Sequence, residues 1–282
     1  MVRLDDLTGP ASEPAALPRL VATDLDGTLV RSDDTVSRFT SEVLTRVRDA
    51  GITLVGITGR GPRLIELCVE HVAGAHFLVL AQGGYVVDLD HGGPPRVVTE
   101  VRVEGAAVAE AVRRIESRTG PVQLLVEALD APGAPLWADQ GALWPYPATI
   151  RVRSRQEALA VPLLKAFVRV PGMSSDELLA MARQVVPPAL CSVTHSGWEY
   201  LEICPPGVSK ASGLAVVAAG LGVDPSEVLV FGDMPNDLSM FAWAGRGVAV
   251  ANAHREVLSV ADDVTTSNDE DGVACYLDRL LR

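Results

Sequence analysis

The residues best placed to do chemistry are two aspartates separated by a single residue. Asp24 and Asp26 follow directly on the apolar run at 19–23, and Gly27 comes next. Carboxylates at positions i and i+2 of an extended turn can face the same side. Their mutual repulsion favours a bound divalent cation, and ligands that are all oxygens favour Mg²⁺. Taken alone, the segment also fits a polar turn closed by Gly27.

A second acidic segment has the same arrangement near the other end of the chain. Asp233 follows the apolar run at 228–231, and Asn236 and Asp237 come soon after it. Because ligands bind at the carboxyl ends of the strands of a parallel sheet, Asp24 and Asp233 are expected to share one site. The alternative is a junction between a strand and a helix in which Asn236 or Asp237 only caps the helix.

Two further segments could hold an anion at this site. Thr58 and Gly59 end the apolar run at 52–58, and a hydroxyl with free backbone N–H groups ahead of a helix forms an anion site. Lys210 stands near the start of a predicted helix and is one of only two lysines, which favours a role in binding phosphate. The other lysine, Lys165, lies in an apolar segment and is predicted at a sheet edge or on the surface.

Strands and helices alternate in the segments that carry these residues. Ser37 or Thr40 is expected to cap a helix that ends near Gly51. This alternation predicts an α/β fold with a parallel sheet covered by helices on both faces. The predicted strands are 19–23, 52–58, 76–82, 228–233, 247–251 and 262–265, and the predicted helices are about 37–50, 62–73, 209–220, 238–245 and 271–281.

The middle of the chain differs in composition from the two ends and is richer in proline. It alternates strand-like and helical pieces, so we expect a separate α+β domain inserted into the α/β core. The stretch 130–150 is predicted as a loop. The expected division is a mobile leader at 1–18, a core at 19–85 and 199–282, and an insert at 86–198, with strands near 122–128, 163–170 and 190–195 and helices near 104–119 and 174–186.

The composition limits the partners. The net charge of −12 argues against nucleic acid or an anionic membrane, although a metal ion and a few cations can still create a site for a small anion. No apolar run reaches the ~18–20 residues of a membrane span, and the N-terminus lacks the apolar core of a secretory signal. The expected location is the cytoplasm, where the four cysteines are expected as free buried thiols.

Taken together, the segments resemble the haloacid dehalogenase superfamily, and within it the Cof-type phosphatases with a type IIB cap. The resemblance covers about 19–85 and 199–282, and it departs from the family where Gln82-Gly83-Gly84 replaces the usual Asn-Gly-Ala and where Ala211 follows Lys210. It implies a Rossmann-like core with an inserted α+β (C2B-type) cap. The segments that carry it are DLDGTLVRSDDTVS at 24–37, ITGR at 57–60, EICPPGVSKASGL at 202–214, FGDMPNDLSMF at 231–241, GVAVANA at 247–253 and TTSNDEDGVACYL at 265–277.

The resemblance also implies a reaction and a role for each residue. A small phosphorylated metabolite would be hydrolysed through an aspartyl-phosphate on the nucleophile Asp24, with Asp26 as general acid and base. Mg²⁺ would be held by Asp24, the backbone carbonyl of Asp26, and Asp233, with Asp237 behind these ligands. The remaining phosphate oxygens would be held by Thr58, Gly59, Lys210 and Asn236.

Two alternatives and several questions stay open. A phosphomannomutase-like transfer would need a second phosphate site in the cap, and a binding module without catalysis would not need the full set of acids. Dehalogenation is unexpected, since a halide leaving group needs no acid such as Asp26. The substrate and the oligomeric state are left open by the sequence. The insert residues that could choose the substrate are Trp137, Trp144, Tyr146, Arg151, Arg153 and Arg155, while Glu199 and Glu202 are equally consistent with a structural role.

Overall fold

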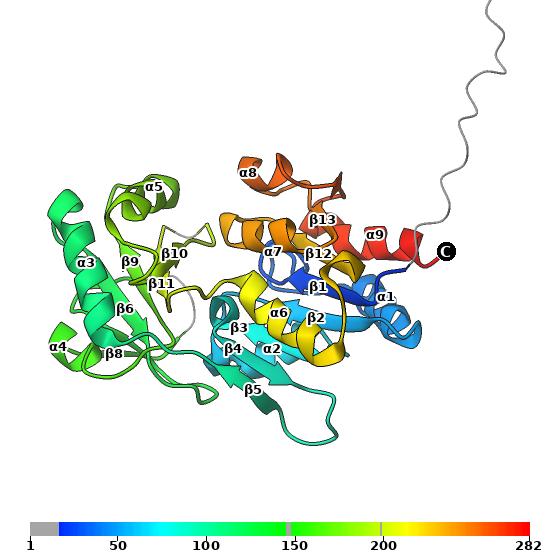
Figure 1. Ribbon diagram of the computed structural model, residues 1–282, viewed down its shortest axis with the longest axis horizontal. Helices are drawn as coiled ribbons and strands as arrows, with labels where there is room; N and C mark the ends of the chain where they lie inside the picture. Colours follow the sequence, from blue (N-terminus) through cyan, green and yellow to red (C-terminus); the bar gives the residue numbers. More distant parts are fainter. Residues whose placement is uncertain (1–16, 145–147, 198) are drawn as a thin grey trace, which may run out of the picture.

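The chain forms two β-sheets that lie at opposite ends of the molecule (Figure 1). The structure, a computed structural model, describes residues 17–144, 148–197 and 199–282. The predicted mobile leader at 1–18 falls almost wholly outside these residues. In Figure 1 the eight-stranded first sheet lies at the right and the six-stranded second sheet at the left.

The first sheet combines both ends of the chain, as the sequence predicts. β1 pairs in parallel with β12 on one side and with β2 on the other. All of β1 is buried, as expected for an apolar strand in a sheet covered on both faces. In spatial order the strands are β14 (Asp263–Val264), β13 (Arg246–Ala249), β12 (Val228–Gly232), β1 (Leu20–Asp24), β2 (Thr53–Ile57), β3 (Phe77–Leu80), β4 (Tyr85–Asp88) and β5 (Arg96–Glu100).

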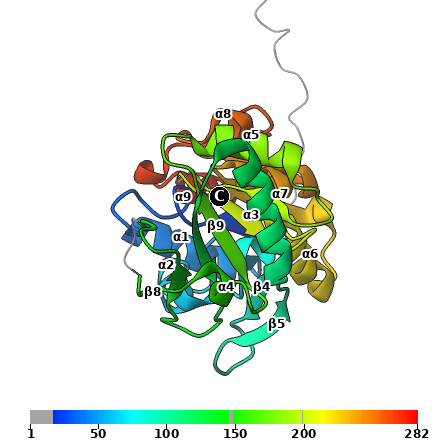
Figure 2. The same cartoon turned by 90° about the vertical axis from the view of Figure 1, so that its left-hand side faces the viewer.

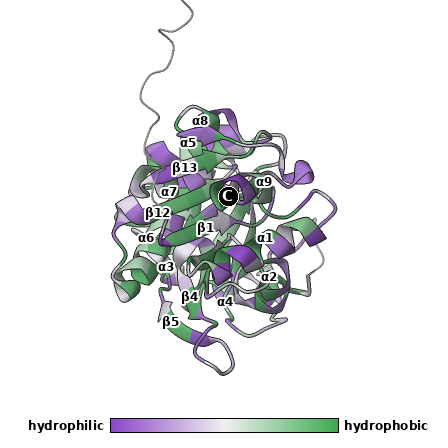
Figure 3. Ribbon diagram, turned by 90° about the vertical axis from the view of Figure 1, so that its right-hand side faces the viewer, coloured by the Kyte–Doolittle hydropathy of each residue, from purple (hydrophilic) through white to green (hydrophobic). Residues whose placement is uncertain are grey.

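Helices cover both faces of the first sheet. Figure 3 shows the strands β12, β13 and β1 between α6 and α7 on one side and α1, α2 and α9 on the other, with the green apolar residues gathered on the strands. α1 begins after Ser37, whose hydroxyl accepts a hydrogen bond from the Thr40 N–H, so this predicted cap is confirmed. The helices are α1 (Arg38–Asp49), α2 (Ile65–His71), α6 (Lys210–Leu221), α7 (Leu238–Trp243), α8 (Arg255–Leu258) and α9 (Gly272–Leu280).

The first sheet extends further along the chain than predicted. β4 and β5 form an antiparallel hairpin that continues the sheet from β3, so residues up to Glu100 belong to it rather than to the insert. The hairpin is visible in the sequence as two valine-containing runs on either side of Gly92, Gly93 and the prolines that follow. The predicted boundary at residue 86 therefore falls inside the first sheet.

The second sheet contains most of the predicted insert. Two of its features differ from prediction, since β11 lies beyond residue 198 and the expected loop at 130–150 contains β7. β7 and β8 are only three residues each, too short to leave a clear alternating pattern. In spatial order the strands are β10 (Ser192–Thr194), β11 (Leu201–Cys204), β9 (Lys165–Arg169), β6 (Gln123–Glu127), β7 (Leu136–Ala138) and β8 (Ile150–Val152).

The two faces of the second sheet carry different neighbours. Figure 2 shows α3 lying in front of β9, and this helix packs with α5 over a core that includes Val112, Val168 and Leu178. The other face carries a smaller apolar cluster that includes Phe167 and Tyr200. Whether the insert folds as a domain of its own stays a prediction. Its helices are α3 (Gly105–Thr119), α4 (Arg155–Ala158) and α5 (Ser175–Val185).

Two predictions from composition can be compared with the structure. None of the helices formed by the described residues is both long and apolar enough to cross a membrane. The four cysteines are free thiols, and three are buried while Cys275 is partly exposed.

Candidate active site

The predicted acids converge at the carboxyl ends of two neighbouring strands. Asp24 is the last residue of β1, and Asp233 directly follows β12, its parallel neighbour. Asp24, Asp233 and Asp237 are all buried, and one carboxylate oxygen from each lies within 4.8 Å of the others. The structure therefore brings Asp24 and Asp233 together as the strand pattern predicts, with Asp237 beside them.

A tight turn after β1 fits the two acidic segments to each other. Thr28 donates its hydroxyl within reach of both Asp24 Oδ2 at 3.2 Å and Asp233 Oδ1 at 2.9 Å. Gly27 has a φ of +77°, and a Cβ at this position would collide with Asp233 Oδ2. Glycine is therefore required here both for the backbone conformation and for the close approach of Asp233. Thr28 lies in the same short motif as Asp24 and Asp26, but its type and position alone do not predict a role in the site.

Lys210 lies at the centre of the acidic cluster. Its Nζ donates to Asp24 Oδ1 at 2.5 Å and to Asp237 Oδ1 at 2.6 Å. The second oxygen of Asp237 accepts the backbone N–H groups of Asp233 at 2.9 Å and Met234 at 3.0 Å. With both oxygens engaged, Asp237 fixes the Asp233 turn and orients Lys210, which supports the predicted place of Asp237 behind the direct ligands.

The electrostatics of the cluster favour an additional cation. Burial raises the pKa of Asp24 from its ordinary 3.8 to about 7, against the opposing attraction of Lys210. Burial also raises the pKa of Asp233, and the charge of Asp24 acts in the same direction. For Lys210, burial alone would lower the pKa, but the charges of Asp237 and Asp24 outweigh it and raise it.

The donor set of the cluster fits Mg²⁺. Asp24, Asp233 and Asp237 supply only oxygens, which are the ligands that hard cations prefer. Among the described residues, Asp233 Oδ2 accepts no hydrogen bond, so this oxygen is available to a metal. The three carboxylates exceed the single charge of Lys210, and a divalent cation would remove the imbalance.

Asp26 is placed beside the cluster but is held by another residue. Arg60 donates its Nε to Asp26 Oδ2 at 2.9 Å, and its Nη2 to Asp26 Oδ1. The Asp26 side chain keeps about a third of its surface exposed, while that of Arg60 is mostly buried. Arg60 follows Gly59 directly in the sequence, yet the sequence reading gave it no role.

Thr58 and Gly59 form the turn expected after β2. Thr58 is buried, and its hydroxyl accepts the Arg60 N–H at 3.0 Å. Within the described part of the chain, the Gly59 N–H has no hydrogen-bond partner. The turn thus leaves one backbone donor free at the same edge of the sheet as Asp24.

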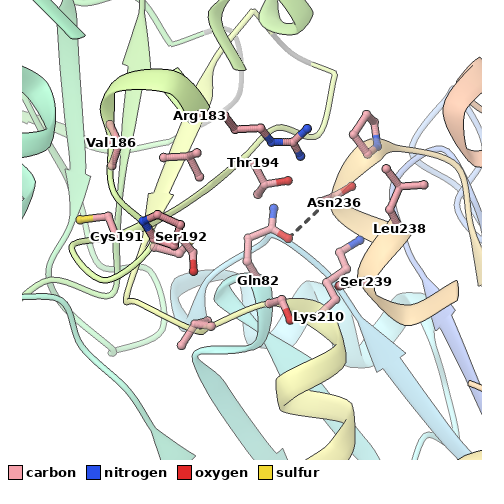
Figure 4. A pocket seen from close by; sticks show the side chains of 16 residues that line it. Gln82, Arg183, Val186, Cys191, Ser192, Thr194, Lys210, Asn236, Leu238 and Ser239 are labelled. Atoms are coloured by element: carbon pink, nitrogen blue, oxygen red, sulfur yellow. Dashed lines mark hydrogen bonds between the residues drawn. The ribbon is translucent and has the colours of Figure 1, made fainter. Parts of the chain in front are cut away.

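Asn236 is buried near the cluster, and its amide is engaged by a residue from another segment. Its Nδ2 donates to Gln82 Oε1 at 3.2 Å (Figure 4). The two side chains lie with Lys210 in the wall of a cavity of about 460 Å³ between the first sheet's helices and the α5–β10 region of the second. In this arrangement one Asn236 amide hydrogen faces Gln82, which the sequence reading did not foresee.

Lys165 contradicts its predicted position at an edge or on the surface. It is 2% exposed in β9, which has neighbours on both sides in the second sheet. Its Nζ donates to Glu202 Oε2 at 2.6 Å and to the Gly59 carbonyl across the gap between the sheets. The prediction is wrong because a lysine in an apolar strand is usually explained by an edge position, and the sequence does not reveal that Glu202 and Gly59 supply partners for a buried one.

The insert residues singled out for specificity have several roles. Arg155 is bound inside the insert by Asp139 and Glu116, at 2.7 Å each. Arg153 lies over the ring of Trp137, with 4.4 Å from its guanidinium carbon to the ring centroid. Trp144 packs against Phe167 and Tyr200, Arg151 is exposed, and Tyr146 lies outside the described residues.

Known proteins resemble this chain in sequence and in fold. A protein of Bacillus subtilis named 5-amino-6-(5-phospho-D-ribitylamino)uracil phosphatase YwtE is 27% identical, with 93% of this chain and 98% of the relative aligned. A haloacid dehalogenase-like hydrolase from Bacteroides thetaiotaomicron superposes with a TM-score of 0.72 at 27% identity, over 93% of this chain and 99% of that one. A subclass IIB sugar phosphatase shares the fold, with a TM-score of 0.75 at 20% identity over 93% and 98% of the two chains.

The family profile matches both parts of the core and much of the insert. The profile described as haloacid dehalogenase-like hydrolase aligns with residues 21–129 and 155–277. These ranges include Asp24, Thr58, Lys210 and Asp233. The chain belongs to the family of haloacid dehalogenase-like hydrolases.

Proposed function

We propose that this protein hydrolyses a small phosphate monoester through an aspartyl-phosphate on Asp24, with Mg²⁺ as cofactor. The observation that carries the proposal is the position of Asp24 between Lys210 and Thr28, beside Asp233. Lys210 donates to one oxygen of Asp24, and the Thr28 hydroxyl, which Asp24 shares with Asp233, lies 3.2 Å from the other. A carboxylate fixed in this way at a strand end can attack phosphorus in line.

The groups around Asp24 are suited to hold a phosphate during this attack. Lys210 supplies a buried positive charge, and the free N–H of Gly59 supplies a neutral donor. Both are fixed before substrate arrives, so they lose little reorganisation energy as charge develops. Thr58 and the free amide hydrogen of Asn236 complete the proposed set of donors.

Asp26 is the proposed general acid, and Arg60 controls its direction. In this arrangement Asp26 accepts hydrogen bonds from Arg60 and donates none. For Asp26 to protonate the leaving oxygen, at least one of these bonds must open. A phosphate dianion is an alternative partner for the Arg60 guanidinium, so substrate binding can release Asp26 for proton transfer.

The proposed metal site uses Asp24, the backbone carbonyl of Asp26, and Asp233. When bound, Mg²⁺ would offset the repulsion between the nucleophile and the phosphate. Asp237 keeps the Asp233 turn in place through its two backbone hydrogen bonds. Hydrolysis of a phosphate monoester requires the activation free energy to be lowered by on the order of 20 kcal/mol or more, and this set of fixed charges is proposed to supply that lowering.

The class of substrate is proposed from the relatives and the charge of the site. The Bacillus subtilis relative carries a name that describes the phosphate ester of a ribitylamino-uracil, so polyol and sugar phosphates belong in the first set of compounds to test. A mutase would need a second phosphate site. Of the arginines considered for it, Arg155 is already used to hold the insert together.

The direct test is release of inorganic phosphate from a panel of phosphorylated metabolites with Mg²⁺. Asp24→Asn should reduce release by at least about 10³-fold, since the nucleophile is lost while the fold is kept. Asp49→Asn, at an exposed position on α1, is the matched control and should behave as wild type. Phosphate release that survives Asp24→Asn would overturn the proposal, and isomerisation of a hexose phosphate without release would favour a mutase.

A further inference from the structure

Lys165 is a buried charge that the reaction proposed above does not use. It lies 2% exposed in the second sheet, and Glu202, its partner at 2.6 Å, is also 2% exposed on the neighbouring strand β11. Removing two charges from water is costly unless their remaining hydrogen-bonding capacity is satisfied. For this pair, some of the remaining hydrogen bonds are formed with residues that belong to the first sheet's side of the molecule.

One contact runs directly from Lys165 to the turn after β2. The Nζ of Lys165 donates to the carbonyl of Gly59, whose own N–H is free in the described part of the chain. This hydrogen bond fixes the plane of the Gly59–Arg60 peptide, whose N–H donates to the Thr58 hydroxyl at 3.0 Å. The two contacts together restrain the turn from which the Gly59 N–H projects. Lys165 thus acts on the position of a proposed phosphate donor without reaching the phosphate.

A second path runs from Lys165 through Glu202 to Asn236. Glu202 Oε1 accepts the side-chain amide of Gln82 at 2.8 Å, and Gln82 Oε1 accepts Nδ2 of Asn236 at 3.2 Å. The carboxylate of Glu202 can only accept hydrogen bonds, so the NH₂ group of Gln82 must face Glu202. The amide oxygen of Gln82 is then left to face Asn236. Gln82 itself has a φ of +60°, an uncommon conformation that persists where surrounding contacts fix it.

We propose that Lys165 is a positioning residue that fixes both the Gly59 turn and the Asn236 amide when the second sheet lies against the first. The inference rests on the proposed function, since it assigns these two segments to phosphate. The consequence is that the phosphate donors are aligned only while the two sheets are together. Packing of the second sheet against the first would then align the phosphate donors in the same step.

The decisive variant removes the Lys165 charge together with its hydrogen-bonded partner acid, and the buried Glu127 beside them keeps its ion pair with Arg63 at 3.5 Å. Lys165→Met with Glu202→Gln replaces the ion pair by neutral groups of similar size, and the introduced glutamine can still accept the Gln82 amide. We expect kcat for p-nitrophenyl phosphate to fall about 10- to 100-fold, as for a small displacement of reacting groups. Affinity for orthovanadate, measured with Mg²⁺, should fall with it, whereas the melting temperature should change little.

Two further variants separate the paths and control for stability. Gln82→Leu breaks the path to Asn236 but keeps the contact of Lys165 with Gly59, so it should reduce kcat less than the double variant. Arg155→Met breaks two ion pairs inside the insert, and within the described residues Arg155 forms no hydrogen bond or ion pair with the first sheet. It should lower the melting temperature and leave kcat and orthovanadate affinity unchanged.

The outcomes distinguish this inference from the function on which it rests. If the double variant is folded and keeps wild-type kcat and orthovanadate affinity, Lys165 serves only the stability of the second sheet and the positioning role is wrong. If wild type itself releases no phosphate from any ester, the proposed function fails and the inference fails with it. Loss of kcat and orthovanadate affinity in the folded double variant, with Arg155→Met unaffected, supports it.

Discussion

At the scale of single residues, the site depends on how Lys210 is shared. One ammonium group serves Asp24 and Asp237 at nearly equal distances of 2.5 and 2.6 Å, and all three side chains are buried. Its attraction fixes Asp24, the proposed nucleophile, and, through Asp237, the turn at Asp233. Because a buried acid without a partner is strongly destabilising, Lys210 and the cation expected at Asp233 together make this group of acids compatible with a folded core.

The role of Asp26 can be tested by the chemistry of the leaving group. Asp26→Asn removes the proposed proton donor, so kcat/KM for an alkyl phosphate should fall by about 10²–10⁴-fold, as is typical of a lost general acid. For p-nitrophenyl phosphate the loss should be much smaller, because p-nitrophenolate departs without being protonated. The measurement is the ratio of the two kcat/KM values in wild type and variant.

The same experiment also exposes a purely structural role. Asp26 anchors Arg60 by two hydrogen bonds, so the variant could disturb the site by releasing Arg60. That disturbance would slow both substrates by the same factor. Equal losses on the alkyl and the nitrophenyl ester would therefore contradict the assignment of Asp26 as general acid.

At the scale of elements, the turn that follows β1 and contains Gly27 determines where Asp233 lies in the proposed metal site. Gly27→Ala should destabilise the protein by more than the ~1–2 kcal/mol expected for a left-handed alanine, because its Cβ would also collide with Asp233 Oδ2. Mg²⁺ affinity should fall as well, since Asp233 has to move. Urea unfolding and Mg²⁺ titration measure the two effects.

A second glycine provides the matched control for this prediction. Gly51 has a φ of +75°, close to the +77° of Gly27, but a Cβ there would meet nothing within 4 Å. Gly51→Ala should therefore show only the backbone cost and keep wild-type Mg²⁺ affinity. If both variants lose the same free energy of unfolding and neither loses Mg²⁺ affinity, the proposed contact between Gly27 and Asp233 has no role.

The elements of the core could be predicted from the sequence because their signals are local. An apolar run such as the one ending at Asp24 predicts a strand, and a capping residue such as Ser37 predicts the start of a helix. Each signal lies within a few residues of the element it predicts. The hairpin of β4 and β5 and the three-residue strand β7 were missed. Such short elements exist because neighbouring strands supply their hydrogen bonds, and a single segment does not contain that information.

At the scale of the whole molecule, the site divides into a part that follows from the strand pattern and a part that does not. Asp24, Asp233 and Thr58 meet because β12, β1 and β2 are adjacent and parallel, which an α/β alternation predicts. Lys165 and Gln82 enter only through contacts between the two sheets. The relative placement of two sheets leaves no local pattern, so the sequence predicts Lys165 at a sheet edge or on the surface.

The stability of the whole protein should report the charge state of the acidic cluster. Because burial raises the pKa of Asp24 from 3.8 to about 7, the folded protein holds a proton that the unfolded chain has lost between these pH values. The free energy of unfolding without metal should therefore contain a term that is fully present below pH 3.8 and is lost as the pH rises toward about 7. The raised pKa of Asp233 acts in the same direction.

Mg²⁺ should reverse this dependence, because in the proposed site it would bind the ionised carboxylates and stabilise only the folded state. We expect the rise in melting temperature on adding Mg²⁺ to be larger at about pH 7.5 than at about pH 5. Asp24→Asn should flatten the metal-free slope and reduce the Mg²⁺ effect, while Asp49→Asn should change neither. A Mg²⁺-induced rise that is equal at both pH values in wild type would mean that the cation binds away from the buried acids, since only protons on those acids compete with it there.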